Sequence, residues 1–584
     1  MTSRSDLPPT HTRGKALFAV ICCMMAAISL RLGYWQIVKG ESLRSISDTQ
    51  VTTQLEQNGL RGKVFTSDGH LLVSNGEYFQ LFAKPPEITA ATHAVAQLLA
   101  PLVAADIFEQ TLASPSATAL QEKQTYFEER LNSDKNWIQL DGKITADTKA
   151  AIEALQFAGI GFQAVTDRVY PEASLAAHLV GFVGKNDTGS ATGYFGIEGA
   201  LQAELSGKQS NQLVATDALG HILAGEHIEE QLVTSGRDVV LTIRRDVQFT
   251  AESYLDWGMQ KYGAASGEIL IMEPTSGKIL AYAQRPSFDP LVYYLYPTSL
   301  FRNSALSDTY EPGSTFKTLT VAAGIDAGAI TPETTCALCS GPRVIDKYTI
   351  KTWNNEYHPN ITVRDALAKS DNTAMIGITD KLGSEKFIEY LHRFKIGEPI
   401  RIDLQGDTDT PFPQKWGPVE LATTSFGQGI SSTTFQMVRA IGALANGGML
   451  VRPRIIEKVI DHQLQQEIPQ QTVEEGRAVS AQTAQTMTEL MVFSAAHGEA
   501  QWTAAKNYTE AGKTGTSQIA HEGGYLEDST IASFVGFAPA AQPKFIMMVK
   551  LVAPQSSPWA AETAAPLWYK VADKLFLLLN IEAS

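Results

Sequence analysis

Apolar residues fall into one long run near the N-terminus and several short runs farther along the chain. The long run covers residues 16–37, which is 22 residues and close to the ~20 that a helix needs to cross a bilayer. Its first charged residue is Arg31, near the far end, where a long side chain can reach the lipid headgroups. We therefore predict a transmembrane helix over residues 15–37, preceded by a tail over residues 1–14.

The residues that flank this run indicate its orientation. Arg13 and Lys15 precede it, and positive charge favours the cytoplasmic side of a membrane. We therefore expect a cytoplasmic N-terminus and a remainder outside the cytoplasm. A cleaved signal peptide would have a shorter apolar core and a small-residue cleavage site, whereas this run ends with Tyr34 and Trp35. Because aromatic side chains suit the membrane interface, an uncleaved anchor is favoured.

Short apolar runs of two kinds occupy residues 38–235. Residues 63–74 alternate between apolar and polar positions around Asp68-Gly69, which predicts a hairpin. Residues 90–155 have apolar positions at helical spacing, so we expect mainly helix there. This mixture is typical of an α/β domain, and it identifies no activity by itself.

Residues 236–584 carry strand patterns near both of their ends. The two pairs of strands are predicted at residues 267–272 with 278–283, and at residues 531–537 with 544–551. Helical patterns lie between the pairs, and an amphipathic helix is predicted at residues 564–579. This order predicts an α+β domain, in which an antiparallel sheet is covered by helices and the two strand pairs come together.

Composition and charge exclude several classes of protein. With 584 residues, 44% of them apolar and 19% charged, the chain has no general signature of disorder and enough material for several domains. Its 47 basic and 62 acidic residues give a net charge of −15, which argues against nucleic acid as a partner.

The cysteines form two close pairs, Cys22-Cys23 and Cys336-Cys339. A disulfide framework is excluded, because the first pair lies in the membrane-spanning run. Tetrahedral zinc would need a second ligand pair at suitable spacing, so no metal is expected. A local disulfide and two free thiols both remain open for the second pair.

Candidate chemistry lies between the two strand pairs. Ser314 and Lys317 stand three residues apart at the start of a helix-like stretch, so their side chains should share one helix face. A serine hydroxyl is a weak nucleophile and needs a nearby base. Lysine can be this base only when it is neutral, which requires burial and a second cation to lower its pKa from about 10.4.

Two further motifs follow in the same chain. They are Ser370-Asp371-Asn372 and Lys513-Thr514-Gly515-Thr516. A single S-x-x-K motif is weak evidence, because surface helices often contain it by chance. All three motifs in this order are a strong signal for one catalytic site.

Together these motifs resemble those of class B penicillin-binding proteins, the membrane-anchored peptidoglycan D,D-transpeptidases, and most of all the cell-division (septal) type. Further matching segments are Arg61-Gly62 and residues 193–198, 285–290, 427–429, 446–448 and 534–539. The resemblance implies a pedestal domain of the penicillin-binding protein dimerisation type over residues 38–235. It implies a transpeptidase domain, similar to serine β-lactamases, over residues 236–584.

The resemblance also implies catalytic roles. Ser314 would attack the penultimate D-alanine carbonyl of a stem peptide, and Lys317 would take the serine proton. Ser370 and Lys513 would relay this proton to the leaving amine, and the charge of Lys513 would help to keep Lys317 neutral. Asn372 would orient Lys317 and the substrate amide.

Substrate binding is expected on the strand after Lys513. Thr514 and Thr516 would offer hydroxyls to the terminal carboxylate, and Gly515 would let the substrate backbone approach. The backbone N–H groups of Ser314 and Thr516 would form the oxyanion hole. No cofactor is implied.

Partners and location follow from the same resemblance. The donor would be a D-Ala-D-Ala stem peptide, the acceptor an amine of a neighbouring stem peptide, and a β-lactam would remain attached as a covalent inhibitor. Transfer to water would give a D,D-carboxypeptidase side activity. No E-D-x-x-F motif of a glycosyltransferase precedes Ser314, so a separate membrane glycosyltransferase and other divisome proteins are the expected partners. The protein would cross the inner membrane once, with a periplasmic catalytic domain.

Other functions were weighed against this one. A β-lactamase would be about half as long and carry a deacylating glutamate in an E-x-x-L-N motif, which is not found after Ser370. A penicillin sensor would add membrane spans and a zinc-protease motif, and a non-catalytic scaffold would be expected to lack a motif residue. An elongation-type transpeptidase would share all the chemistry and remains an alternative.

Overall fold

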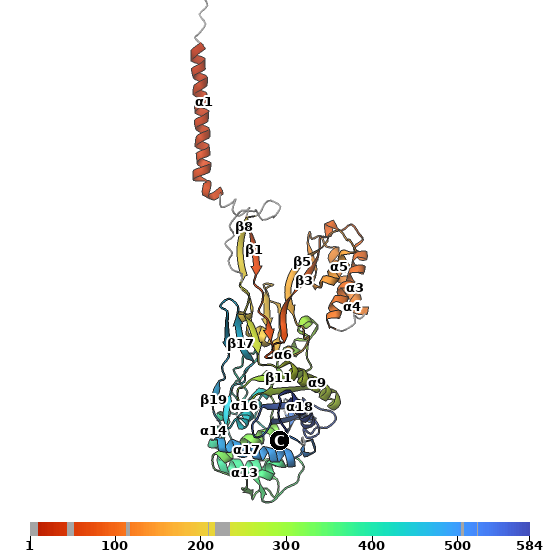
Figure 1. Cartoon of the computed structure of the whole chain (residues 1–584), viewed down its shortest axis with the longest axis vertical. Helices are drawn as coiled ribbons and strands as arrows, with labels where there is room; N and C mark the ends of the chain where they lie inside the picture. The colour runs from red at the N-terminus through yellow and green to blue at the C-terminus, as the bar shows by residue number, and fades with distance from the viewer. Residues whose placement is uncertain are drawn as a thin grey trace, which may run out of the picture. The chain divides into compact units, whose positions relative to one another are not determined.

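The computed structural model describes residues 10–43, 52–111, 117–207, 209–215, 234–503, 507–521 and 524–583 (Figure 1). The first nine residues of the predicted cytoplasmic tail lie outside this description. The chain divides into two compact units: Met1–Gly59 with Gly207–Ser235, and Leu60–Ser206 with Gly236–Ser584.

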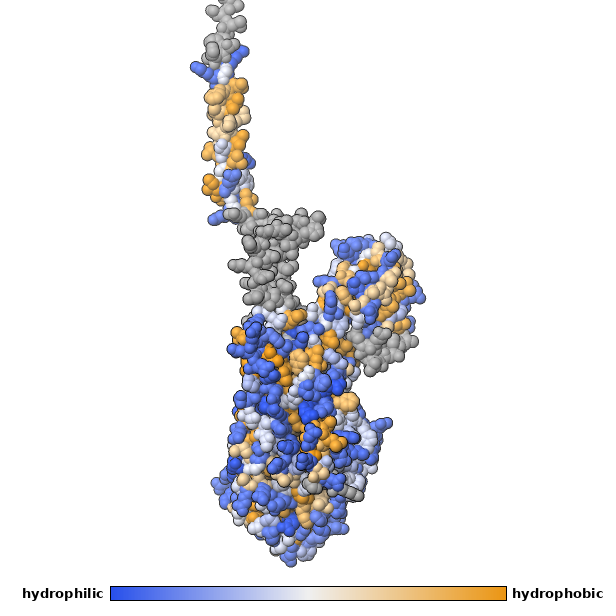
Figure 2. Space-filling view, viewed as in Figure 1, coloured by the Kyte–Doolittle hydropathy of each residue, from blue (hydrophilic) through white to orange (hydrophobic). Residues whose placement is uncertain are grey.

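The first unit contains the predicted apolar helix. Helix α1 covers Thr10–Gly33 and continues as a π-helical turn, η1, over Tyr34–Val38. The stretch Arg13–Val38 has a mean hydropathy of 2.1, is not buried, and is long enough to cross a membrane. Figure 2 shows apolar side chains along its surface. The same unit pairs β1 (Thr52–Asn58) with β8 (Gln209–Ala215) in antiparallel register.

A seven-stranded mixed sheet begins the second unit. Its strand order is β18-β17-β9-β2-β3-β4, and β5 also pairs with β3. The strands are β2 (Val64–Phe65), β3 (Leu71–Ala83), β4 (Ile138–Ile144), β5 (Ile160–Val169), β9 (Asp238–Leu241), β17 (Ile456–Asp461) and β18 (Gln466–Pro469). Strands β2 and β3 form the predicted hairpin, with Gly69 at φ +85° in the turn. This sheet combines strands from both sides of residue 235.

The segment 90–155 is less helical than its spacing predicts. It contains α3 (Thr92–Thr111), α4 (Ala117–Leu131) and α5 (Ala146–Glu153), which gather beside β3 (Figure 1), but β4 interrupts them. The expectation of mainly helix was therefore wrong for residues 138–144. Ile138 and Leu140 alternate inward against Phe127 in one core, which is the burial pattern of a strand.

The second sheet has five strands, all antiparallel, in the order β11-β10-β22-β21-β20. They are β10 (Ser266–Met272), β11 (Ile279–Arg285), β20 (Ala511–His521), β21 (Gly524–Ala538) and β22 (Phe545–Val552). The two predicted strand pairs meet where β10 pairs with β22. The predicted antiparallel sheet and its closure are confirmed.

Helices cover both faces of this five-stranded sheet. Ile269 and Ile271 pack on one side with α9 (Arg245–Tyr262) and α18 (Ala564–Leu578). Leu270 and Met272 point to the other side, where they share a core with α11 (Lys317–Asp326), α13 (Asn372–Leu382), α16 (Thr434–Ala445) and α17 (Ala481–His497). Successive side chains of a strand point to opposite faces, so a strand covered on both faces is apolar throughout.

The remaining helices and strands of the second unit are short or surround the site. They are α6 (Ala177–Val180), β6 (Phe182–Lys185), β7 (Ala191–Tyr194), α7 (Gly196–Ala200), α8 (Gln202–Leu205), α10 (Ser304–Ser307), α11 (Lys317–Asp326), β12 (Thr335–Cys336), β13 (Arg343–Ile345), β14 (Tyr348–Ile350), β15 (Ile361–Thr362), α12 (Val363–Ala368), α13 (Asn372–Leu382), α14 (Ser384–Arg393), α15 (Pro418–Thr424), α16 (Thr434–Ala445), β16 (Met449–Val451), β19 (Glu474–Arg477) and α17 (Ala481–His497). Cys336 and Cys339 form a disulfide, which decides between the two states that the sequence left open.

Candidate active site

Ser314 lies in a short 3-10 turn, η5 (Gly313–Phe316), that leads directly into α11. The sequence predicts a helix beginning at this serine, and the structure places one tighter turn before the α-helix. Gly313 has φ +54°, and a Cβ on it would lie 2.9 Å from the Thr516 carbonyl oxygen on β20. The turn therefore lies close against the strand that carries the third motif. The Ser314 side chain is half-buried.

Lys317 is the first residue of α11 and is fully buried. Its Nζ donates to the Ser370 carbonyl oxygen at 2.6 Å, to Ser370 Oγ at 3.1 Å and to Asn372 Oδ1 at 2.7 Å. Burial, followed by the charge of Lys513, lowers the pKa of Lys317 to about 7, while Glu499 and Asp371 oppose this shift. A large fraction of this amine is therefore neutral near neutral pH.

The second motif forms the turn between α12 and α13. Ser370 has φ +58°, a left-handed conformation that is uncommon for residues other than glycine and is often found at functional sites. Asp371 Oδ1 then accepts from the backbone N–H groups of Thr373 at 2.7 Å and Ala374 at 3.1 Å, which caps α13. This cap fixes Ser370 and Asn372 on either side of Asp371. The side chains of both residues accept hydrogen bonds from Lys317 Nζ.

Lys513 reaches the same place from β20. Its Nζ donates to Ser370 Oγ at 3.2 Å, to the Thr514 carbonyl oxygen at 3.2 Å and to Thr514 Oγ1 at 3.1 Å. Burial lowers the pKa of Lys513, and the charge of Glu499 raises it. The structure thus brings Lys317, Ser370, Asn372 and Lys513 into one hydrogen-bonded group. Within the described chain, the Ser314 hydroxyl makes no hydrogen bond.

The three residues after Lys513 have different surroundings. The Thr514 hydroxyl donates to Glu499 Oε2 at 2.8 Å, and the Thr516 hydroxyl accepts from the Ala560 backbone N–H at 3.1 Å. A Cβ on Gly515 would lie 2.7 Å from the Thr315 methyl group. The glycine is therefore required for close packing of β20 on η5, a reason that the sequence interpretation did not give.

Several groups around the site were missed at the level of sequence. Glu499 follows α17 and belongs to none of the three motifs. Asn372 Nδ2 donates to the Lys351 carbonyl oxygen at 2.8 Å, so a segment after β14 contacts the second motif. The segment 427–429 makes a tight turn beside the site, because Gly427 has φ +81° and its carbonyl oxygen accepts from the Gly313 N–H at 3.0 Å.

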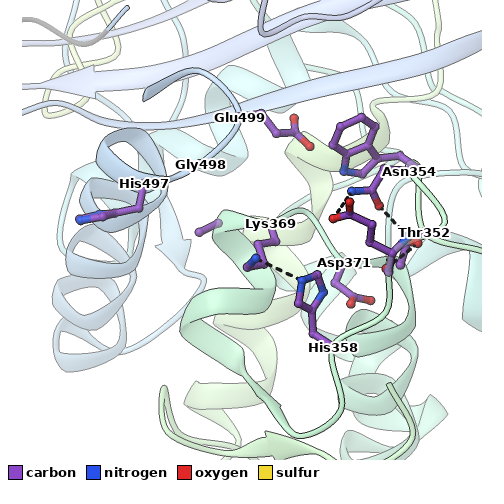
Figure 3. Close-up of a pocket in the computed structure, with 11 residues that line it drawn as sticks. Thr352, Asn354, His358, Lys369, Asp371, His497, Gly498 and Glu499 are labelled. Atoms are coloured by element: carbon purple, nitrogen blue, oxygen red, sulfur yellow. Dashed lines mark hydrogen bonds between the residues drawn. The ribbon is translucent and has the colours of Figure 1, made fainter. Parts of the chain in front are cut away.

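A pocket of about 140 Å³ adjoins the second motif (Figure 3). Glu499, Asp371 and Lys369 lie in its wall, and Lys369 Nζ is 3.2 Å from His358 Nε2. In the ranges that the structure describes, no group of three or more His, Cys, Asp or Glu side chains could hold a metal ion. The pocket is therefore a polar recess beside the second motif, and its wall carries charged groups of both signs.

This fold, with its three motifs gathered at one place, is typical of a class of protein: the serine acyltransferases. Comparison with known proteins agrees. The penicillin binding protein transpeptidase domain model matches residues 267–573, and the penicillin-binding protein dimerisation domain model matches residues 56–241. The chain belongs to the penicillin-binding protein transpeptidases, and it is a peptidoglycan D,D-transpeptidase.

Similar proteins cover nearly the whole chain. Stage V sporulation protein D of Bacillus subtilis is 30% identical over 557 residues, which are 94% of this chain and 83% of that protein. Probable peptidoglycan D,D-transpeptidase PenA of Neisseria meningitidis is 27% identical over 585 residues, which are 98% of this chain and 94% of that protein. The crystal structure of penicillin binding protein 2X from Streptococcus thermophilus has a TM-score of 0.70 at 22% identity, covering 91% of this chain and 80% of that one, and so shares the fold.

Proposed function

We propose that Ser314 is the nucleophile of this transpeptidase and that Lys317 is its base. The supporting observation is the buried Lys317 amine. It donates hydrogen bonds to the side chains of Ser370 and Asn372, and its pKa is lowered to about 7. The serine proton passes to Lys317, and Ser370 with Lys513 returns it to the leaving D-alanine amine. The acyl group of the stem peptide then remains on Ser314 until the amine of a second stem peptide attacks it.

The substrate is held on β20. Asn372 orients the substrate amide, and Lys513, Thr514, Gly515 and Thr516 surround the place of its terminal carboxylate. The backbone N–H groups of Ser314 and Thr516 stabilise the oxyanion, and each such donor typically contributes a few kcal/mol. Close packing of η5 on β20, which needs Gly313 and Gly515, supports this arrangement.

Acylation by a fluorescent penicillin tests this assignment. The full-length protein in detergent is expected to carry one label, and mass spectrometry of the digested adduct should locate it on the peptide that contains Ser314. Ser314→Ala should abolish labelling, and Lys317→Met should reduce it by roughly 10³-fold or more. Labelling of Ser314→Ala at the rate of the unchanged protein would reject Ser314 as the nucleophile.

In the cell we propose a septal role at the inner membrane. The N-terminal tail is cytoplasmic, α1 is the single anchor, and residues 38–235 and 236–584 form the periplasmic pedestal and transpeptidase domains. A membrane glycosyltransferase and other divisome proteins supply the glycan strands. The sequence resemblance to division enzymes supports this proposal, as do Arg13 and Lys15, which precede the apolar run within α1. Depletion should give filaments with blocked septa, whereas rounded cells would indicate an elongation role.

A further inference from the structure

Glu499 contacts the catalytic group although no motif contains it. Its Oε2 accepts a hydrogen bond of 2.8 Å from the Thr514 hydroxyl, and the same hydroxyl oxygen accepts from Lys513 Nζ at 3.1 Å. A hydroxyl has one proton and two lone pairs. The only proton of Thr514 is therefore donated to Glu499 in this structure.

Thr516 has the opposite arrangement. Its hydroxyl oxygen accepts from the Ala560 N–H at 3.1 Å, and it donates to no group in the part of the chain that the structure describes. The proton of Thr516 is thus free for a substrate carboxylate. The two threonines of the third motif share one strand face but differ in what they can offer.

The charge of Glu499 also bears on both lysines. Acylation needs Lys317 neutral and Lys513 charged, although burial disfavours charge on both of them. The carboxylate of Glu499 raises the pKa of each lysine, and it reaches Lys513 through a single intervening hydroxyl. An acidic side chain at this position therefore favours the ammonium form of Lys513.

We propose that Glu499 is a positioning residue of the transpeptidase, an inference that rests on the proposed roles of Ser314, Lys317 and Lys513. It holds the Thr514 hydroxyl so that its oxygen faces the Lys513 ammonium, and it keeps that ammonium protonated beside Lys317.

The pocket supplies a matched control. Besides Glu499, its titratable lining residues are Glu356, His358, Lys369, Asp371 and His497 (Figure 3). Glu356 accepts from Asn354 Nδ2 at 3.0 Å and has no bond to the third motif. Glu356→Gln therefore removes the same charge from the same pocket without touching Thr514.

The decisive measurement is the pH profile of penicillin acylation for Glu499→Gln, Glu499→Asp and Glu356→Gln in the full-length protein. Loss of the Glu499 charge lowers the pKa of both lysines. The acylation rate should rise with pH as Lys317 loses its proton, which is the acid limb of the profile, and fall as Lys513 loses its proton, which is the basic limb. In Glu499→Gln both limbs should move to lower pH by at least about half a unit. Glu499→Asp should move them less, and Glu356→Gln should leave them in place. Unmoved limbs in Glu499→Gln, with a melting temperature like that of the unchanged protein, would overturn the proposal.

The threonines provide a second, independent measurement. Thr516→Val should weaken the reversible binding of a carboxylate-bearing penicillin by about tenfold and leave the limbs in place. Thr514→Val removes the hydroxyl between Glu499 and Lys513 but keeps the Glu499 charge, so it should move the limbs in the same direction as Glu499→Gln and by less. Limbs that stay in place in Thr514→Val would overturn the role of this hydroxyl. The label on Ser314 separates the two levels: labelling that survives Ser314→Ala rejects the proposed function, whereas unmoved limbs with normal Ser314 labelling reject only the role of Glu499.

Discussion

Lys317 and Lys513 donate hydrogen bonds to the same atom, the Ser370 hydroxyl oxygen, at 3.1 and 3.2 Å. The two amines come from different elements, α11 and β20, and both are buried. Like charges this close disfavour each other, so one of the two groups loses its proton more easily. Burial and the charge of Lys513 lower the pKa of Lys317 to about 7, which is the state that its proposed role as the base requires.

Removal of the second cation should reverse this effect. In Lys513→Met the pKa of Lys317 should rise, because the repulsion from Lys513 is lost while the nearby carboxylates remain. The acid limb of penicillin acylation should then move to higher pH by about one unit or more. Lys513→Arg keeps a cation and should keep the limb closer to its original pH. An acid limb at the same pH in Lys513→Met would contradict the electrostatic explanation.

The lowered pKa of Lys317 also makes stability depend on pH. The folded protein releases this proton near pH 7, whereas the unfolded chain keeps it up to about pH 10.4. Between these values unfolding takes up a proton, so the free energy of unfolding rises with pH, by at most about 5 kcal/mol from this group. Melting curves of the unchanged protein and Lys317→Met should show the unchanged protein gaining relative stability from pH 7 to 10. A constant difference in melting temperature would contradict this prediction.

Local patterns predicted the parts of the molecule in which neighbours along the chain also pack together. Four of the five strands in the second sheet were predicted from short apolar runs, such as Ile269 to Met272, which are apolar on both faces. The mixed sheet was not predicted as a whole, because β17 joins β9 from more than 200 residues farther along the chain, and periodicity carries no information about such pairing.

The site shows the same limit. The motifs identified Ser314, Lys317 and Lys513 because each stands at a fixed spacing from other recognisable residues. Glu499 contacts Thr514 only through the fold, and its own neighbours in sequence carry no signal. The spacing of Cys336 and Cys339 likewise does not distinguish a disulfide from two thiols, because both states share the same sequence.

Gly515 should tolerate no side chain unless its neighbour becomes smaller. A Cβ at this position would lie 2.7 Å from the Thr315 methyl group, 2.8 Å from Ser533 Oγ and 3.1 Å from the Pro312 carbonyl oxygen. Gly515→Ala should therefore push η5 away from β20 and slow acylation at Ser314 by about tenfold or more. Thr315→Ser removes the methyl group but keeps the hydroxyl that donates to Pro312. The double variant should recover part of the rate, and no recovery would show that the methyl contact is not the cause.

The buried carboxylate of Glu198 should matter for stability and not for acylation. Its side chain is 0% exposed and pairs with Arg61 and Arg168, each at 2.6 Å. Glu198→Gln leaves two guanidinium groups without a counter-charge, and such losses typically cost about 3–5 kcal/mol. Glu204→Gln is the matched control, because its pair with Arg237 is also 2.6 Å long but 39% exposed on both sides, and exposed pairs contribute about 1 kcal/mol or less. Denaturant unfolding should therefore show a large loss for Glu198→Gln and a small one for Glu204→Gln, with equal penicillin acylation rates in the folded proteins. Equally small losses of stability in the two variants would mean that the buried ion pairs of Glu198 with Arg61 and Arg168 do not stabilise the mixed sheet.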